Sequence, residues 1–266
     1  HQTSVALNRL TKRQIGEMMA RQSGMDDLPA EIVDQVIDRT DGVPLFVEEF
    51  TNMLLESGTI ERIRNQSAET SGSFAPIEIP ATLQDLLMAR LDRMASNLDV
   101  VQLGATIGRE FSFELIREVS PLSEDELQAE LTKLVEAELL FERGRGQRVL
   151  YQFKHALIQD AAYGSLVRRK RQEFHQCIAE SLEAKFEDVI ARQPELLAHH
   201  FSEAGNAAKG VEYWLKAGRR ANQQSANTEA IAHLSRGLEL LEKLDEGPDR
   251  DKFELDLRVT LAVPLT

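Results

Sequence analysis

Cysteine, aromatic residues and long apolar runs are scarce in this sequence. Of 266 residues, one is cysteine, one is tryptophan and three are tyrosine. A lone Cys177 cannot form an internal disulfide, so nothing requires an oxidising compartment and we expect a cytoplasmic protein. No apolar run approaches the roughly 18 residues that span a bilayer, so we expect no membrane partner. The first residues, HQTSVALNRLTKRQ, lack the apolar core of a signal peptide, and a start on His1 instead of Met indicates a fragment.

Positive charge is also in short supply. Lys and Arg total 31 against 44 Asp and Glu, a formal net charge of −13. Such a surface repels polyanions, so nucleic acid is a disfavoured partner. The strongest local exception is the run Val167–Arg171, which contains four consecutive cations. Short basic runs more often form a solvated helix start than a nucleic-acid patch, and we favour the helix start.

Motifs that carry catalysis are missing as well. The chain contains no G-x-x-x-x-G-K-[ST] phosphate loop and no G-x-S-x-G nucleophile elbow. His199, His200 and Glu203 have the i,i+3 and i,i+4 spacing with which side chains on one helix face could bind a metal. The catalytic glutamate of a zinc protease would directly follow the first histidine, and here it does not. We therefore favour helix packing for this histidine pair, and predict neither catalytic residues nor a metal site.

Helical periodicity, by contrast, is abundant. Apolar residues recur at three- and four-residue spacing through most of the chain. Residues 1–61 contain three such helices, which begin at Thr11, near Pro29 and after Pro44. Residues 62–80 are polar, rich in turn-forming residues and without periodicity, so we predict a loop or linker there.

Residues 81–170 have a different pattern. A helix starts at residues 80–82, and three more follow in the stretches VVQLGATIG, FELIREVS and ELQAELTKLVEAELL. Ser123 and Glu126 form a capping box at the start of the last one. The strands LLFER and RVLYQFK then flank the glycine-containing turn 144–147, which indicates a hairpin. Three helices followed by a two-stranded wing are typical of a winged helix.

Residues 171–266 predict a series of helical hairpins. Four helical stretches are joined by short breaks: EFHQCIAESLEAKF, PELLAHHFSEAG, AAKGVEYWLKAGRRANQQSA and NTEAIAHLSRGLELLEKL. The last two together have about the length of one tetratricopeptide repeat, near 34 residues. Small residues stand where two such helices need close approach: Ala217, Gly218, Ala221 and Ala230. Because a solenoid needs about three repeats and a cap, we expect this array to be truncated.

Six stretches, in order, resemble one family. They are DGVPLFVEE, IPATLQDLLMARLDRM, ATIGREFSFELI, YQFKHALIQDAAYGSL, PELLAHHFSEAG and EYWLKAGRRANQQSANTEAIAHLSRGLELLEKL. Together they look like the region that follows the ATPase core in bacterial signal-transduction ATPases of the STAND class, which are AAA-like proteins with class III adenylate or guanylate cyclase domains or LuxR-type domains. The resemblance implies a mainly α fold: a helical lid at 1–61, a winged helix with a small β-hairpin wing at 81–170, and tetratricopeptide-like hairpins at 171–266.

The resemblance also implies candidate nucleotide contacts. Gly42 and Pro44 match the Gly-x-Pro motif of the family's lid, whose proline packs near the nucleotide base; the alternative is a helix-starting proline after a glycine hinge. His155 resembles a winged-helix histidine that contacts ADP phosphates, but the Met and Asp of that Met-His-Asp motif are absent. We favour a structural role for His155 at the junction of strand and helix. Arg109, between two helices, could form an ion pair or face the ATPase core, and we favour the ion pair.

These features predict a regulatory and interaction fragment of a nucleotide-switch ATPase of the cyclase-fused type, without the P-loop or the cyclase core. ATP or ADP would be held by an ATPase core upstream, which is one expected partner; the other is a protein bound to the repeats. The chain alone would bind no cofactor. A bare scaffold would differ only in that Gly42, Pro44 and His155 never meet a nucleotide.

A DNA-binding winged-helix regulator is the alternative. A recognition helix needs basic or amide side chains aimed at base edges. The third helix of the predicted winged helix has one lysine, Lys133, against six acidic residues, which phosphates would repel: Glu124, Asp125, Glu126, Glu130, Glu136 and Glu138.

Overall fold

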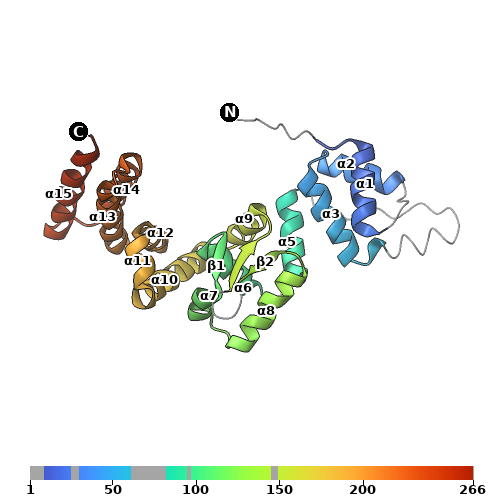
Figure 1. Cartoon of the computed structure of the whole chain (residues 1–266), viewed down its shortest axis with the longest axis horizontal. Coiled ribbons are helices and arrows are strands. Elements are labelled where there is room, and N and C mark those ends of the chain that lie inside the picture. Colours follow the sequence, from blue (N-terminus) through green and yellow to red (C-terminus); the bar gives the residue numbers. More distant parts are fainter. Residues whose placement is uncertain (1–8, 25–29, 61–81, 95–96, 145–148, 266) are drawn as a thin grey trace. The chain divides into compact units, whose positions relative to one another are not determined.

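A computed structural model describes residues 9–24, 30–60, 82–94, 97–144 and 149–265. The chain forms two compact units, His1–Met94 and Ala95–Thr266. Both are mainly helical, and the second also contains a small antiparallel sheet (Figure 1). None of the described helices is long and apolar enough to cross a membrane. The predicted linker at 62–80, Pro29 and most of the predicted turn at 144–147 lie outside the described residues.

Unit 1 is built on α1 (Lys12–Ser23), α2 (Ala30–Thr40) and α3 (Pro44–Glu56). α1 starts where predicted, because the Thr11 hydroxyl accepts from the Gln14 backbone and the Gln14 side chain accepts from the Thr11 backbone. Apolar side chains of the three helices form the core of the unit: Ile15, Met19, Ile32, Val33, Val36, Phe46, Val47, Phe50, Met53 and Leu54.

α5 (Leu83–Met94) belongs to the same unit, whereas the sequence pattern placed its residues in the following segment, 81–170. Its Leu86 is fully buried in the core of unit 1. One turn further on, the Arg90 side chain is only 2% exposed and forms ion pairs with Glu49 and Glu56 of α3; the Arg90 Nε to Glu56 Oε1 distance is 2.8 Å. α5 therefore packs on α3 through apolar contacts and through the buried ion pairs of Arg90.

Unit 2 begins with three helices and a three-stranded sheet (Figure 1). The helices are α6 (Leu98–Ile107), α7 (Phe113–Val119) and α8 (Glu124–Glu136), and the strands are β1 (Glu110–Ser112), β2 (Leu140–Arg143) and β3 (Leu150–Phe153). β3 lies in the centre and pairs antiparallel with both neighbours, so the strand order is β1-β3-β2. The pairing of β2 with β3 confirms the predicted hairpin, whereas the sequence did not predict β1.

Phe111 of β1 joins the sheet to α6. Its ring stacks on Tyr151 with 5.9 Å between centroids and contacts Phe153 at 6.0 Å. A Cβ on Gly104 of α6 would lie 2.8 Å from the Phe111 ring, so α6 can approach the sheet this closely only with glycine there.

α8 confirms one prediction and corrects another. It starts at the predicted capping box of Ser123 and Glu126. It ends at Glu136, earlier than predicted, because Glu138 takes a left-handed φ of +56° and Leu140 already belongs to β2.

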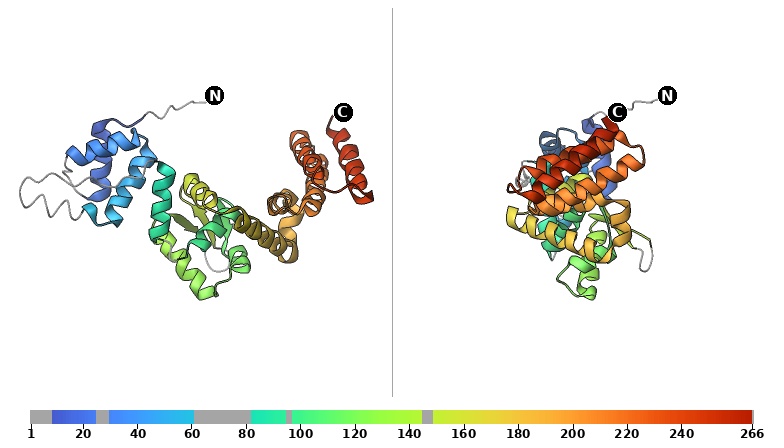
Figure 2. Two further views of the ribbon diagram at one scale, coloured as in Figure 1. Left: turned by 180° about the vertical axis from the view of Figure 1, so that it is seen from behind. Right: turned by 90° about the vertical axis from the view of Figure 1, so that its left-hand side faces the viewer.

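The rest of unit 2 is a succession of helices. α9 (Ala156–Gly164) follows the sheet and α10 (Arg168–Lys185) follows α9; then come α11 (Glu187–Arg192), α12 (Pro194–Ala204), α13 (Ala207–Gln223), α14 (Asn227–Leu241) and α15 (Pro248–Ala262). α12 packs on both α10 and α13, and α14 packs on both α13 and α15 (Figure 2). From α12 onward, helices adjacent in the sequence therefore pair in space, as helical hairpins do.

Small residues allow these helices to pack closely. A Cβ on Gly218 of α13 would lie 2.4 Å from the Leu234 side chain of α14, and one on Gly210 would lie 2.4 Å from Leu240. The alanines predicted at the same interface are buried as well: Ala217, Ala221 and Ala230. The predicted close approach of α13 and α14 is confirmed.

The basic run forms the first turn of α10, which begins earlier than predicted, with Val167 as its N-cap. Lys170 pairs with Asp99 of α6, and Arg169 pairs with Glu173 at 2.8 Å. The Arg171 guanidinium lies over the Tyr163 ring, 4.5 Å from its centroid. Three of the four cations thus have partners within the unit, and the run forms the predicted helix start.

Candidate functional site

The turn between α2 and α3 contains Gly42, the first predicted nucleotide contact. Gly42 is buried with φ +69°, and a Cβ there would lie 2.6 Å from the Leu10 carbonyl oxygen. The Leu10 N–H donates to the Gly42 carbonyl at 2.8 Å. The backbone alone therefore requires glycine at this position.

Pro44, the second predicted contact, is exposed and is the first residue of α3. The N-cap residue, Val43, makes no side-chain hydrogen bond to the helix. The first N–H groups of α3 thus lack a side-chain cap, and the helix dipole favours an anion at this end. Pro44 has the position of a helix-starting proline, and that position is equally compatible with a contact to a nucleotide.

His155 is the N-cap of α9, two residues after the end of β3. Its side chain is half-buried, and its carbonyl accepts from the Ile158 N–H at 3.1 Å. The preceding Lys154 pairs with Glu138 at 2.7 Å and its N–H donates to the Leu139 carbonyl. The predicted position of His155 at the junction of strand and helix is confirmed. It belongs to unit 2, whereas Gly42 and Pro44 belong to unit 1.

The prediction for Arg109 was wrong. Its side chain is exposed, and no ion-pair partner lies near it within the described part of the chain. Its backbone carbonyl instead accepts from the Phe153 N–H at 3.0 Å, so the residue extends the pairing of β1 with β3.

A cluster of three histidines and a tyrosine lies between α9, α10 and α12. His175 Nδ1 lies 2.8 Å from His200 Nδ1, and His175 Nε2 lies 2.9 Å from the Tyr163 hydroxyl. His175 and His200 are 0% and 1% exposed, while the adjacent His199 is exposed. His200 is thus buried between helices as predicted, and the more exposed His199 also contacts the His175 ring of α10, with 5.5 Å between the ring centroids.

Burial keeps the two buried histidines neutral at neutral pH. It lowers the pKa of His175 to about 4, with His199 and Arg171 adding to the effect. It also lowers the pKa of His200 well below the usual range. Because two neutral rings share the Nδ1 to Nδ1 hydrogen bond, one Nδ1 donates and the other accepts.

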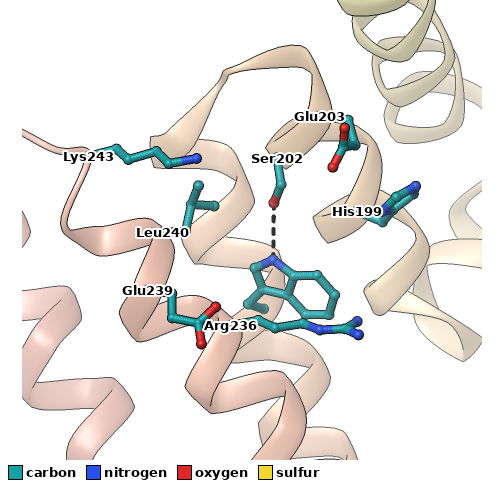
Figure 3. A pocket seen from close by; sticks show the side chains of 8 residues that line it. His199, Ser202, Glu203, Arg236, Glu239, Leu240 and Lys243 are labelled. Atoms are coloured by element: carbon teal, nitrogen blue, oxygen red, sulfur yellow. Dashed lines mark hydrogen bonds between the residues drawn. The ribbon is translucent and has the colours of Figure 1, made fainter.

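Two cavities adjoin the cluster, and His199 and Glu203 line both. The first has a volume of about 440 Å³ and lies between α12 and α14 (Figure 3). There the Trp214 indole N–H donates to the Ser202 hydroxyl at 3.0 Å, and Arg236 lies 5.2 Å from the indole centroid. The second has a volume of about 400 Å³ and is lined by residues of α6, α9, α10 and α12.

Sequence reasoning missed two groups of side chains. One is the buried ion-pair cluster of Arg90 with Glu49 and Glu56, and the other is the contact between Tyr163 and His175. Glu49 could have pointed to the ion-pair cluster, because its carboxylate lies on the buried face of the apolar stretch FVEEFTNMLL and a buried carboxylate needs a partner. The second gave no local signal, because its residues stand on different helices.

This chain is similar to a known domain family and to a known protein, and the description of neither states a function. Residues 11–67 match a family model described as "Domain of unknown function (DUF8739)". The chain is also similar to "Uncharacterized protein R02095" of Rhizobium meliloti (strain 1021), with 25% identity over 225 residues. That match covers 84% of this chain and 21% of the relative, so the chain spans about a fifth of the relative's length.

Proposed function

We propose that this chain is a regulatory and interaction part of a nucleotide-switch signalling ATPase of the STAND class. In this proposal unit 1 is the lid, the first part of unit 2 is a winged helix, and the helices from α10 onward are tetratricopeptide-like repeats. The observation that carries the proposal is the order of elements in unit 2. Three helices, a sheet with β3 between β1 and β2, and then helical hairpins follow one another as the family resemblance requires.

The spacing of residues in α13 and α14 supports the repeat assignment. The tetratricopeptide pattern has Trp and Gly four residues apart in the first helix, and a small and a large residue four apart in the second. Trp214 and Gly218 have the first spacing, and Ala230 and Leu234 have the second. The contact between Gly218 and Leu234 places these positions against each other, as the pattern needs.

The proposed mechanism is a shift of population between a closed and an open state. Nucleotide in an upstream ATPase core holds the lid and winged helix closed through Pro44, the turn at Gly42, and His155. Nucleotide exchange, or a protein bound to the repeats, then favours the open state and passes the change to an output domain. The buried charge between Arg90 and α3 makes α5 a rigid part of the lid.

The alternative of a DNA-binding regulator is disfavoured by the surface of α8. The exposed residues of this helix include four carboxylates: Glu124, Asp125, Glu126 and Glu136. Its one lysine, Lys133, is already paired with Glu130 at 2.8 Å. Phosphates would repel such a helix from a major groove.

Calorimetric titration with ADP tests the proposal that an upstream ATPase core, and not this chain, holds the nucleotide. The 266-residue chain should bind neither ADP nor ATP tightly, because it has no phosphate loop. A longer protein that includes the sequence upstream of His1 should bind ADP tightly. Micromolar affinity of the 266-residue chain alone would contradict the proposal.

A further inference from the structure

The second cavity beside the histidine cluster contains hydrogen-bond donors without partners. It lies within unit 2, where the C-terminal end of α6 meets α9, α10 and α12. Tyr163 and Arg171 line one part of it, and Asp160 and Glu203 also line it. Its volume of about 400 Å³ is within the range of small-molecule sites.

The direction of the hydrogen bonds leaves the Tyr163 hydroxyl proton available to a ligand. His200 Nε2 is buried without a partner among the described residues. A buried N–H without an acceptor is rarer than a buried acceptor without a donor, so the His200 proton belongs on Nδ1. His175 Nδ1 then accepts from His200, and His175 Nε2–H donates to the Tyr163 oxygen. The Tyr163 O–H, which has no acceptor in the described structure, is left to donate into the cavity.

Arg171 supplies the second unused donor. Its Nε is buried and has no hydrogen-bond partner in the described part of the chain. One terminal nitrogen makes long hydrogen bonds, at 3.3 and 3.4 Å, to the carbonyls of Tyr163 and Leu166. Stacking of the guanidinium on the Tyr163 ring holds it in place. The Nε–H of a fixed guanidinium is one prong of the fork that binds carboxylates.

The acidic residues decide which anion fits. Arg171 is the one Arg or Lys among the lining residues, whereas Asp160 and Glu203 contribute two carboxylates. Neither carboxylate pairs with Arg171 within the described structure, although all three line the same cavity. The cavity therefore has a positive charge and two negative charges on its walls that do not form an ion pair with one another. Inorganic phosphate, with its higher negative charge, would be repelled by the two carboxylates. A zwitterion could place its negative group at Arg171 and its positive group at Asp160 and Glu203.

We propose that this cavity binds a free amino acid, whose carboxylate accepts from Arg171 and Tyr163 and whose ammonium group faces Glu203 and Asp160. The site lies among helices on both sides of the α9–α10 junction. An amino acid bound there would connect the sheet-containing part of unit 2 to the helical hairpins. The inference does not depend on nucleotide binding elsewhere.

Titration of the 266-residue chain with each of the twenty common amino acids tests the proposal. Calorimetry, or Trp214 fluorescence, should show at least one that binds with a dissociation constant below 1 mM. For that amino acid, the N-acetylated and the carboxamide forms should each bind at least tenfold more weakly. Inorganic phosphate at the same concentration should not bind.

Variants locate the binding at this cavity. Arg171→Gln should weaken binding at least tenfold, and Tyr163→Phe, which keeps the ring under the guanidinium, should weaken it about threefold to tenfold. Arg169→Gln, an exposed change on the same turn of α10, should leave affinity unchanged. The proposal is overturned if no amino acid binds with a dissociation constant below 1 mM, or if Tyr163→Phe and Arg171→Gln, both folded by circular dichroism, bind as the wild type does.

Discussion

Replacement of Arg90 with methionine should lower the free energy of unfolding of unit 1 by about 3–5 kcal/mol, the cost of leaving a buried charge without its partner. Arg90 and Glu49 are 2% and 0% exposed, and Glu56 is 17% exposed. Burial raises the pKa of Glu56, although the charge of Arg90 opposes this. Without the guanidinium, the buried carboxylate of Glu49 would lose its ion pair with Arg90.

Two further variants separate the ion pairs from other effects. Arg93→Met, on the same helix but exposed, should change stability by less than about 0.5 kcal/mol. The triple variant Arg90→Met, Glu49→Leu, Glu56→Leu should recover most of the loss, because apolar replacement of a whole buried cluster is often neutral. Urea unfolding followed by circular dichroism measures these effects. An Arg90→Met variant as stable as the wild type would contradict the buried-charge account.

Acidification should destabilise unit 2 between about pH 6.5 and pH 4. Unfolded histidine takes up a proton near pH 6.5, whereas burial lowers the pKa of folded His175 to about 4. The unfolded state therefore binds more protons in this range, and stability falls as the pH falls. The pKa difference of His175 corresponds to a loss of about 3 kcal/mol, and His200 adds to it in the same direction.

Trp214 gives this measurement a local reporter, because it is the sole tryptophan and lies in unit 2. Urea unfolding followed by its fluorescence should show the loss of stability on going from pH 7 to pH 4.5. A His175→Gln, His200→Gln variant should have a flatter dependence over the same range, since it lacks both titrating rings. Burial also lowers the pKa of the neighbouring His199, so His199→Gln should flatten the dependence as well, but less than the double variant does. Equal slopes in the wild type and the double variant would show that other groups are responsible.

Local signals in the sequence predicted most of the helices. The capping boxes of Thr11 and Ser123 act within a single turn, so both helix starts were visible in the residues themselves. The hairpin of β2 and β3 was predicted because its strands are adjacent in the sequence. β1 was missed because it has only three residues and its partner, β3, follows some forty residues later. Such pairing depends on the tertiary fold.

The candidate sites were predictable only in part. The resemblance pointed to Gly42, Pro44 and His155, and local geometry accounts for the glycine by its backbone alone. The ion pairs of Arg90 bring together residues that are 34 and 41 positions apart. The partners of Tyr163 and His200 likewise stand on other helices. No pattern in one segment reveals a contact of this kind, since it arises when the helices pack.

ADP release from a longer protein that contains this chain and its upstream ATPase core tests the central claim most directly. If the lid and winged helix contact the nucleotide, His155→Ala and Pro44→Ala should each release ADP at least tenfold faster than the wild type. Arg168→Ala, at an exposed residue of α10 without an ion pair in the described structure, should release it at the wild-type rate. Unchanged ADP release in both the His155 and the Pro44 variants would contradict the claim that this chain is part of a nucleotide switch.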